Sequence, residues 1–284
     1  MALLLTAPNL TEVVLKQLAE RVYEASGIRL TDRQRPQIET RVAQRLQALR
    51  LDDPAEYEKH LGSEGSRSEE MEIFLDLLAV HESYFFREIS QLSFVADDLV
   101  EEARERRGTE PVRIWSAGCV AGEEPYSLAM LLEDAEAWKK GPIDMLGTDM
   151  SATCLERARQ AVYGKASLRQ TSRARRSRFF EPVHGGLRVQ ASVRRRVRFR
   201  RMNLYREGPS GWMGQFDIIL CRNLLLYFDV PARCRVVEAL YSRLRPGGCL
   251  LLSRSETLLN VRTRLQTTEQ GDEIVYRRAM EEKA

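Results

Sequence analysis

The second half of the chain alternates between strand-like and helix-like segments, and this alternation constrains the fold more than any other feature. Short apolar segments with strand character lie at residues 112–115, 143–148, 216–220 and 249–252. Helical patterns follow them at residues 124–138, 151–161 and 231–244. Strands that alternate with helices form a parallel sheet covered on both faces. We therefore expect an α/β domain over residues 111–284, with a last strand at 273–277 closing one edge.

Before Val112 the sequence carries no strand pattern. Helical periodicity is visible at residues 10–26, 38–49, 56–61 and 69–80. Thr31 and Gln34 have the spacing of a capping box, which marks the start of the second helix. We expect an all-α N-terminal domain over residues 1–87, followed by a linker helix at 88–110.

Composition favours a protein that neither enters a membrane nor depends on metal or disulfides. The chain has 284 residues, 43% hydrophobic and 30% charged, which is ordinary for a soluble globular protein. No apolar run is long enough to span a bilayer, and residues 1–5 are too short and lack the basic flank of a signal peptide. The five cysteines are scattered without a CxxC pair. We expect a cytoplasmic protein.

One segment is strongly basic. Residues 165–201 contain thirteen Lys or Arg residues and a single acid, Glu181. β-favouring residues alternate with arginines around a turn at Gly185 and Gly186, which predicts a small β insertion at about residues 175–203. Such a basic block favours an acidic partner or a polyanion. RNA therefore stays an alternative partner, although few aromatic residues are interleaved with the arginines.

Polar residues follow three of the predicted strands. Gly118 and Gly122 lie in the loop after the first, Asp149 ends the second, and Arg222 and Asn223 follow the third. In an open parallel sheet, ligands bind at the carboxyl ends of the strands. Glycines permit close approach to the backbone, and an acid after the second strand commonly accepts hydrogen bonds from ribose hydroxyls, although it can instead cap a helix. The pattern predicts a ribose-containing ligand.

Two further segments carry candidate residues. Tyr227 lies four residues after Asn223, where it either faces the same cleft or packs in the core. The segment from His81 to Arg87 lies at the join between the two predicted domains, and such joins are favoured ligand sites. Paired aromatics at Phe85 and Phe86 indicate packing for at least one of them.

These segments together resemble the CheR family of chemotaxis-receptor glutamate methyltransferases. The family has a sequence close to Asn-x-Thr-x-Phe-Phe-Arg at the position of residues 81–87. It also has Gly-Glu-Glu-Pro-Tyr-Ser, found here at 122–127, and Cys-Arg-Asn-x-x-x-Tyr-Phe, found here at 221–228. The resemblance covers nearly the whole chain. It implies a Rossmann-like S-adenosylmethionine-dependent methyltransferase domain with a small inserted β-subdomain, preceded by an all-α domain.

The resemblance also implies site residues. Positions that bind S-adenosylmethionine in the family correspond to His81, Ser83, Arg87, Glu124, Asp149, Asn203, Leu204, Arg222 and Asn223. His81 replaces an asparagine and Ser83 a threonine of the family pattern. We expect Arg87 and Tyr227 to act in catalysis, and Arg41 with Arg45, one helical turn apart, to contact the substrate.

The implied activity is methyl transfer to glutamate carboxylates in the cytoplasmic methylation helices of chemoreceptors, with S-adenosylhomocysteine as product. We expect a monomer without metal, nucleic acid or membrane insertion. The short connection at residues 181–186 predicts that the enzyme acts without binding a receptor tail, because tethering members have a longer glycine-rich loop there. An RNA-directed methyltransferase and a non-catalytic S-adenosylmethionine sensor stay as alternatives.

Overall fold

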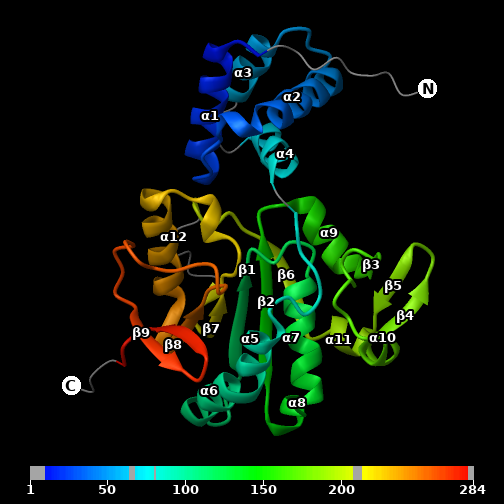
Figure 1. Ribbon diagram of the computed structural model, residues 1–284, viewed down its shortest axis with the longest axis vertical. Helices are drawn as coiled ribbons and strands as arrows, with labels where there is room; N and C mark the ends of the chain where they lie inside the picture. The colour runs from blue at the N-terminus through cyan, green and yellow to red at the C-terminus, as the bar shows by residue number, and fades with distance from the viewer. Residues whose placement is uncertain (1–9, 64–67, 80, 207–212, 281–284) are drawn as a thin grey trace. The chain divides into compact units, whose positions relative to one another are not determined.

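The computed structural model describes residues 10–63, 68–79, 81–206 and 213–280. The chain divides into two compact units, residues 1–80 with 227–232, and residues 81–226 with 233–284 (Figure 1). Two expectations, the character of residues 1–5 and the helical state of Val80, lie outside the described residues.

The first unit is helical, as the sequence predicts. Its helices are α1 (Glu12–Ser26), α2 (Arg35–Leu49), α3 (Pro54–Ser63) and α4 (Glu69–Leu78), with a 3-10 turn η1 (Asp32–Gln34) before α2. The capping box of Thr31 and Gln34 is present. Leu18, Val42 and Phe74 come from different helices and are fully buried, so one apolar core holds the helices together.

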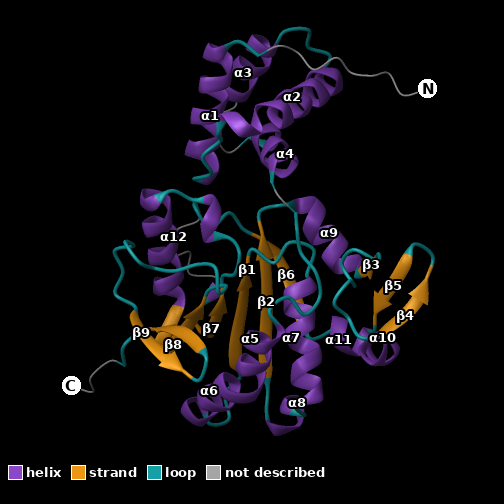
Figure 2. Ribbon diagram, viewed as in Figure 1, coloured by secondary structure: helices purple, strands orange, loops and turns teal. Residues whose placement is uncertain are grey.

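The second unit is built on a seven-stranded sheet with the order β6-β2-β1-β7-β8-β10-β9 (Figure 2). Its strands are β1 (Val112–Ala117), β2 (Ile143–Asp149), β6 (Val197–Arg201), β7 (Phe216–Leu220), β8 (Leu244–Leu251), β9 (Gln266–Gln270) and β10 (Glu273–Arg277). The first five strands in this order are parallel, and β10 runs antiparallel to both neighbours. The predicted strands are confirmed, whereas β9 was not predicted.

The helices of this unit depart from the expected pattern at a break after Asp134. They are α5 (Ile89–Phe94), a π-helical segment η2 (Val95–Leu99), α6 (Val100–Arg107), α7 (Glu123–Asp134), α8 (Ala137–Lys140), α9 (Ala152–Gln160) and α12 (Val230–Arg243). The single helix expected over residues 124–138 is wrong, because Glu136 takes a left-handed φ of 54° and starts α8. The linker helix is α5 to α6, which packs in the same core as β1.

A small antiparallel sheet lies between α9 and β6. It has the order β3-β5-β4, with β3 (Val162–Tyr163), β4 (Phe180–Val183) and β5 (Gly186–Val189), and it is accompanied by α10 (Arg173–Phe179) and α11 (Ala191–Arg194). It stands at the right of Figure 1.

The predicted extent of this insertion is wrong at its C-terminal end. Val197–Arg201 is β6, which pairs in parallel with β2 from Met145 to Asp149. Val197 is buried, and the Phe199 ring packs edge-on against Tyr126 at 5.3 Å, while the intervening arginines are exposed. Apolar residues that alternate with arginines therefore belong here to an edge strand of the large sheet with one buried face. The strands of a separate hairpin would show the same sequence pattern.

Among the described residues, no helix combines the length and the apolar character that crossing a bilayer requires.

Candidate functional site

The carboxyl ends of the five parallel strands lie along one edge of the large sheet. From β1 the chain proceeds outward to β2 and β6 on one side, and later to β7 and β8 on the other. The strand order therefore reverses between β1 and β7, which is where open α/β sheets bind ligands. The loops at this edge contain Gly118, Asp149, Asn203 and Arg222.

The loop after β1 is shaped by glycines. Gly118 has φ of 78° and Gly122, the N-cap of α7, has φ of 89°, both in the left-handed region that favours glycine. The main-chain N–H groups of Gly118 and Cys119 donate to the Thr148 carbonyl oxygen at 2.8 and 2.9 Å. A Cβ on Gly118 would lie 2.9 Å from Leu224 Cδ2 in the loop after β7, so the Leu224 side chain would have to shift.

Asp149 joins the loops that follow β1 and β2. Its Oδ2 accepts a 2.9 Å hydrogen bond from the Val120 N–H, and its Oδ1 accepts one of 2.9 Å from the Ser151 N–H. The N-cap of α9 is Ser151, whose hydroxyl accepts from the Cys154 N–H. Ser151, and not Asp149, is therefore the N-cap residue of α9.

Asn203 and Leu204 reach this edge because β6 lies beside β2. The Met202 N–H donates to the Asp149 carbonyl oxygen at 2.9 Å, immediately after the strand ends. Asn203 Oδ1 then accepts from the Tyr205 N–H at 3.1 Å, and the Leu204 side chain is buried. The structure thus brings Asn203 and Leu204 to the same edge as Asp149.

Arg222 is a buried cation between two carboxylates. Its side chain is 1% exposed, and it forms ion pairs of 3.0 Å with Glu124 and 3.1 Å with Glu88. It also donates to the Arg87 carbonyl oxygen at 2.8 Å, while the other Glu124 oxygen accepts from Ser116 Oγ at 2.7 Å. One guanidinium therefore joins the end of β7, the start of α7 and the turn before α5.

Glu256, in the loop after β8, was not identified from the sequence. Its carboxylate accepts hydrogen bonds from the main-chain N–H groups of Asn223 at 2.7 Å, Leu226 at 3.2 Å and Ser253 at 3.1 Å, and from Ser253 Oγ at 2.8 Å. Asn223 has a left-handed φ of 57°, so the hydrogen bonds to Glu256 stabilise a residue with a strained backbone. Its position shortly after the fourth predicted strand could have identified it, because polar residues that follow parallel strands lie at the edge of the sheet where ligands bind.

The segment from His81 to Arg87 is anchored by its two phenylalanines. The Phe85 ring makes edge-on contacts with Tyr163 at 4.7 Å and Phe180 at 5.1 Å, both from the small sheet. The Phe86 N–H donates to Ser127 Oγ at 2.9 Å. Both phenylalanines are buried, which confirms the packing expected for at least one of them.

The predicted site residues of this segment are more accessible than its phenylalanines. His81 is exposed, and Ser83 and Arg87 are half-buried. Arg87 Nη1 donates to the Glu82 carbonyl oxygen at 3.4 Å, and its guanidinium lies 5.6 Å from the Tyr84 ring centroid. The weak hydrogen bond leaves the guanidinium able to bind a further anion.

Glu123 is a buried acid beside the predicted site. Burial raises the pKa of its carboxyl group, and hydrogen bonds from its own main-chain N–H and from Ser167 oppose that rise. The Ser167 hydroxyl donates to Glu123 Oε1 at 2.9 Å, so the acid connects α7 to the segment between β3 and α10.

The remaining predicted residues lie in the first unit. Tyr227 ends the 3-10 helix η4 (Leu225–Tyr227) and begins the segment 227–232. Arg45 donates two hydrogen bonds of 2.8 and 2.7 Å to Glu70, which also accepts from Tyr57 Oη at 2.8 Å. Arg41 donates to Gln44 at 3.1 Å. The charge of Arg45 is therefore balanced by Glu70 within the helical unit. Contact of either arginine with a substrate stays a prediction.

Within the described ranges, no group of three or more His, Cys, Asp or Glu side chains is arranged to hold a metal ion.

Comparison with known proteins places this geometry in a family. Residues 14–79 match the all-alpha domain, and residues 81–274 the SAM binding domain, of the CheR methyltransferase. A "Chemotaxis protein methyltransferase 2" of Vibrio cholerae is 31% identical over 89% of this chain and 88% of its own length. A protein of the same description from Pseudomonas aeruginosa is 34% identical over 86% of each chain. The "Chemotaxis protein methyltransferase" of Salmonella typhimurium is 32% identical over 89% of this chain and 86% of its own.

Proposed function

The chain belongs to the CheR methyltransferase family, and from this premise we propose that it transfers a methyl group from S-adenosylmethionine to glutamate side chains of chemoreceptors. The observation that carries the proposal is the meeting of Asp149, Asn203, the Gly118 loop and Arg222 at one edge of the sheet, inside the region that matches the SAM binding domain. The relatives that support a receptor substrate are themselves described as chemotaxis proteins.

The residues at this edge fit S-adenosylmethionine. Asp149 offers acceptors for ribose hydroxyls, and the loop at Gly118 permits contact between its backbone and a ligand. Glu124 and Arg222 fix the ends of α7 and β7 around that loop. We assign Asn203, Leu204 and Asn223 to the same ligand, together with His81, Ser83 and Arg87 from the anchored segment. The site needs no metal in this assignment.

When bound, S-adenosylmethionine would supply an electrophilic methyl group, and transfer to the acceptor would break its S–C bond and form an O–C bond. A glutamate carboxylate has a pKa near 4.3, so it is already ionised at neutral pH and needs no general base. The protein therefore acts by alignment and by exclusion of water. Arg87 orients the acceptor carboxylate or the cofactor, and Tyr227 positions the reacting groups. Arg87→Ala and Tyr227→Phe should each lower kcat, and full activity in both would contradict these roles.

We assign the electrostatic attraction of an acid-rich receptor segment to Arg41 and to the basic insertion. Arg45 forms an ion pair with Glu70, whereas Arg41 donates a hydrogen bond to the neutral side chain of Gln44. Long-range attraction between charges is screened by salt. Methyl transfer should therefore decline steeply with ionic strength, and Arg41→Gln should reduce that dependence more than Arg45→Gln does.

The small sheet supports action without a receptor tether. β4 and β5 are joined by a two-residue turn, because Val183 pairs with Gly186. A Cβ on Gly186 would lie 2.3 Å from the Tyr163 carbonyl oxygen, so this turn is tightly packed against β3. Titration with a receptor-tail pentapeptide should show no binding below millimolar concentration, and micromolar binding would contradict tether independence.

The decisive experiment is transfer of radiolabelled methyl from S-adenosylmethionine to membranes that contain candidate chemoreceptors. A glutamate methyl ester releases the label as methanol in base, whereas methyl groups on nitrogen or RNA are retained. Asp149→Asn serves as a binding-defective control. Base-stable label would exclude the glutamate ester, and absence of transfer despite cofactor binding would favour the sensor alternative.

The basic block gives less support to RNA than its composition implies. Several of its arginines already have acidic or aromatic partners: Arg169 with Glu82, Arg178 with Asp134, Arg198 with Asp144, and Arg196 over the Trp138 ring. Phosphate binding requires free basic groups and shows a steep salt dependence. A filter-binding assay with total RNA should show no retention above that of an unrelated basic protein.

A further inference from the structure

The short segment that carries Arg87 has a strained backbone. Phe86 has φ of 61° and Glu88 has φ of 50°, so both neighbours of Arg87 lie in the left-handed region although neither is glycine. Such residues are uncommon, and they persist only where the surrounding structure holds them. Strain of this kind concentrates at functional sites, so the contacts that hold residues 86–88 bear on the reaction.

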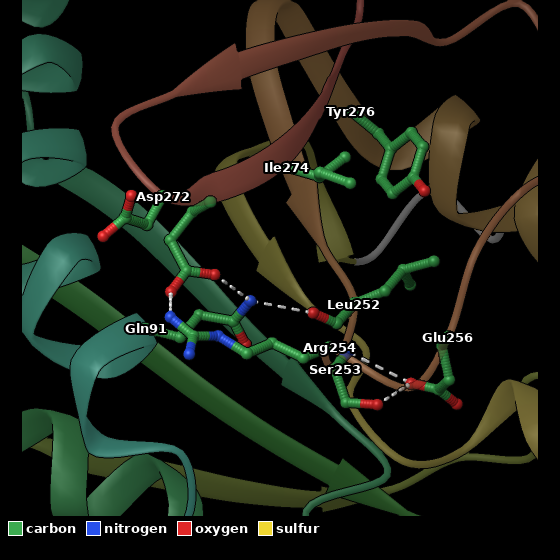
Figure 3. Close-up of a pocket in the computed structure, with 9 residues that line it drawn as sticks. Gln91, Leu252, Ser253, Arg254, Glu256, Asp272, Ile274 and Tyr276 are labelled. Atoms are coloured by element: carbon green, nitrogen blue, oxygen red, sulfur yellow. Dashed lines mark hydrogen bonds and ion pairs between the residues drawn. The ribbon is translucent and has the colours of Figure 1, made fainter.

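The chain is fixed on both sides of this strained segment. Before it, the Phe86 N–H donates to Ser127 Oγ at 2.9 Å, and the Phe86 ring is buried. After it, α5 is held by the buried side chain of Gln91, whose Nε2 donates to the Leu252 carbonyl oxygen and to Glu273 Oε2, both at 3.0 Å (Figure 3). The conformation between these two anchors therefore depends on the contacts of residues 87 and 88 themselves.

Those contacts converge on one buried guanidinium. Arg222 Nη2 donates to the Arg87 carbonyl oxygen at 2.8 Å and to Glu88 Oε2 at 3.1 Å, so a single nitrogen contacts both the main chain and the carboxylate. The Arg222 side chain is 1% exposed, and its Nη1 is held by Glu124 at 3.0 Å. Glu88 Oε2 also accepts from the Arg254 N–H at 3.4 Å. The Glu88 carboxylate thus ties the strained segment to a fixed cation.

The Arg87 side chain has weaker contacts than its backbone. Its hydrogen bond to the Glu82 carbonyl oxygen is 3.4 Å long, and its guanidinium lies 5.6 Å from the Tyr84 ring centroid. The direction of the guanidinium therefore depends on the backbone from which it extends. We propose that Glu88 is a positioning residue for Arg87, an inference that rests on the role of Arg87 in the proposed function. Loss of the Glu88 charge relaxes the segment and misaligns the guanidinium, which lowers the rate of transfer.

Glu88→Gln tests the proposal, because the amide keeps the shape of the carboxylate and lacks its charge. At saturating S-adenosylmethionine and receptor membranes, kcat for methyl transfer should fall at least fivefold. In an Arg87→Ala background the same substitution should change the remaining kcat by less than twofold, because no guanidinium is left to position. An unchanged kcat in the native background, or equal falls in both backgrounds, overturns the proposal.

Asp144→Asn is the matched control. Asp144 lies near the beginning of β2, its side chain is 27% exposed against 24% for Glu88, and it pairs with Arg113 and Arg198. This variant loses a comparable charge without a change at residues 86–88, so its kcat should stay within twofold of the native value.

Amide hydrogen exchange measures the segment without catalysis. A peptide that covers residues 81–92 should exchange at least threefold faster in Glu88→Gln than in the native chain, and at the native rate in Asp144→Asn. Unchanged exchange in Glu88→Gln overturns the proposal whether or not the chain methylates receptors. Absence of methyl transfer by the native chain contradicts the proposed function instead, so the two failures are distinct.

Discussion

The main-chain N–H of Asn223, which follows β7, donates a 2.7 Å hydrogen bond to Glu256 Oε2 in the loop after β8. This contact joins two loops that are 33 residues apart in sequence, and it holds Asn223 in a left-handed conformation. Glu256 is therefore a positioning residue for the part of the site that follows β7.

Glu256→Gln should weaken S-adenosylhomocysteine binding about tenfold, because charge-assisted hydrogen bonds are each worth about 1.5–3 kcal/mol and some are retained by the amide. Calorimetric titration measures the affinity. Glu238→Gln is the matched control, since Glu238 is an exposed acid on α12 that pairs with Arg264. A dissociation constant within twofold of the native value would show that the hydrogen bonds to Glu256 do not determine the geometry of the site.

Gly118→Ala should weaken cofactor binding and destabilise the second unit by about 1–2 kcal/mol, because the left-handed φ is strained for alanine and the Leu224 side chain must shift away from the new Cβ. Gly271→Ala separates the two effects: Gly271 also has a left-handed φ, of 60°, but nothing lies within 4 Å of its Cβ position. It should lose stability without losing cofactor affinity. Equal losses of affinity in the two variants would contradict a specific role for the Gly118 loop.

Arg222→Met should lower the free energy of unfolding by about 3–5 kcal/mol, since it leaves two carboxylates without their buried cation. Urea denaturation followed by circular dichroism measures the change. Adding Glu88→Gln and Glu124→Gln should restore part of that loss, because the unpaired charges are then removed. A loss below about 1 kcal/mol in Arg222→Met would mean that water satisfies both carboxylates.

Because Glu123 is buried, the stability of the protein should depend on pH. Its pKa is raised in the folded protein by burial, so folding favours the protonated form. The associated stability is present below the unfolded pKa of about 4.3 and is lost as the pH rises through the raised folded value. Glu123→Gln should therefore gain stability relative to the native chain between pH 4 and pH 7. A difference that stays constant over this range would contradict the effect of burial.

Thiol accessibility provides a test of the core. Of the five cysteines, four are buried and only Cys234 is half-buried. Burial also raises the pKa of Cys249 to about 12, which suppresses its thiolate at neutral pH. Ellman's reagent at pH 8 should modify a single thiol in the native protein and all five in denaturant. Cys234→Ser should eliminate the native reaction, and rapid modification of a second thiol would indicate an opening of the sheet core.

The parts of the fold that were predicted from sequence are those governed by local patterns. Helical periodicity placed α1 to α4, and apolar runs placed β1, β2, β7 and the end of β8. β9 was missed because its residues are polar and mostly exposed, so it has no apolar signal. β8 begins before the predicted segment 249–252 and contains a register shift, because Phe216 pairs with Leu244 but Ile218 pairs with Cys249. Pairing of this kind is a tertiary property.

The site was predictable wherever a polar residue follows a strand, as at Asp149 and Arg222. The roles of Glu88 and Glu256 depend on the distant groups that their carboxylates contact, the Arg222 guanidinium for Glu88 and the Asn223 N–H for Glu256, and local patterns do not carry that information. β6 was misplaced because its arginines dominated its composition. Its correct position beside β2 explains why Asn203 belongs with Asp149. The domain boundaries expected at residues 87 and 111, and the monomeric state, stay predictions.

The edge-on packing of Phe85 against Tyr163 and Phe180 has a thermodynamic consequence. It connects the small sheet to the segment that carries His81, Ser83 and Arg87. A ligand that shifted this packing when it bound the small sheet would also change the affinity for the cofactor. By reciprocity, the cofactor would change the affinity of the small sheet by the same factor. In that case the packing of Phe85 would couple the two binding equilibria.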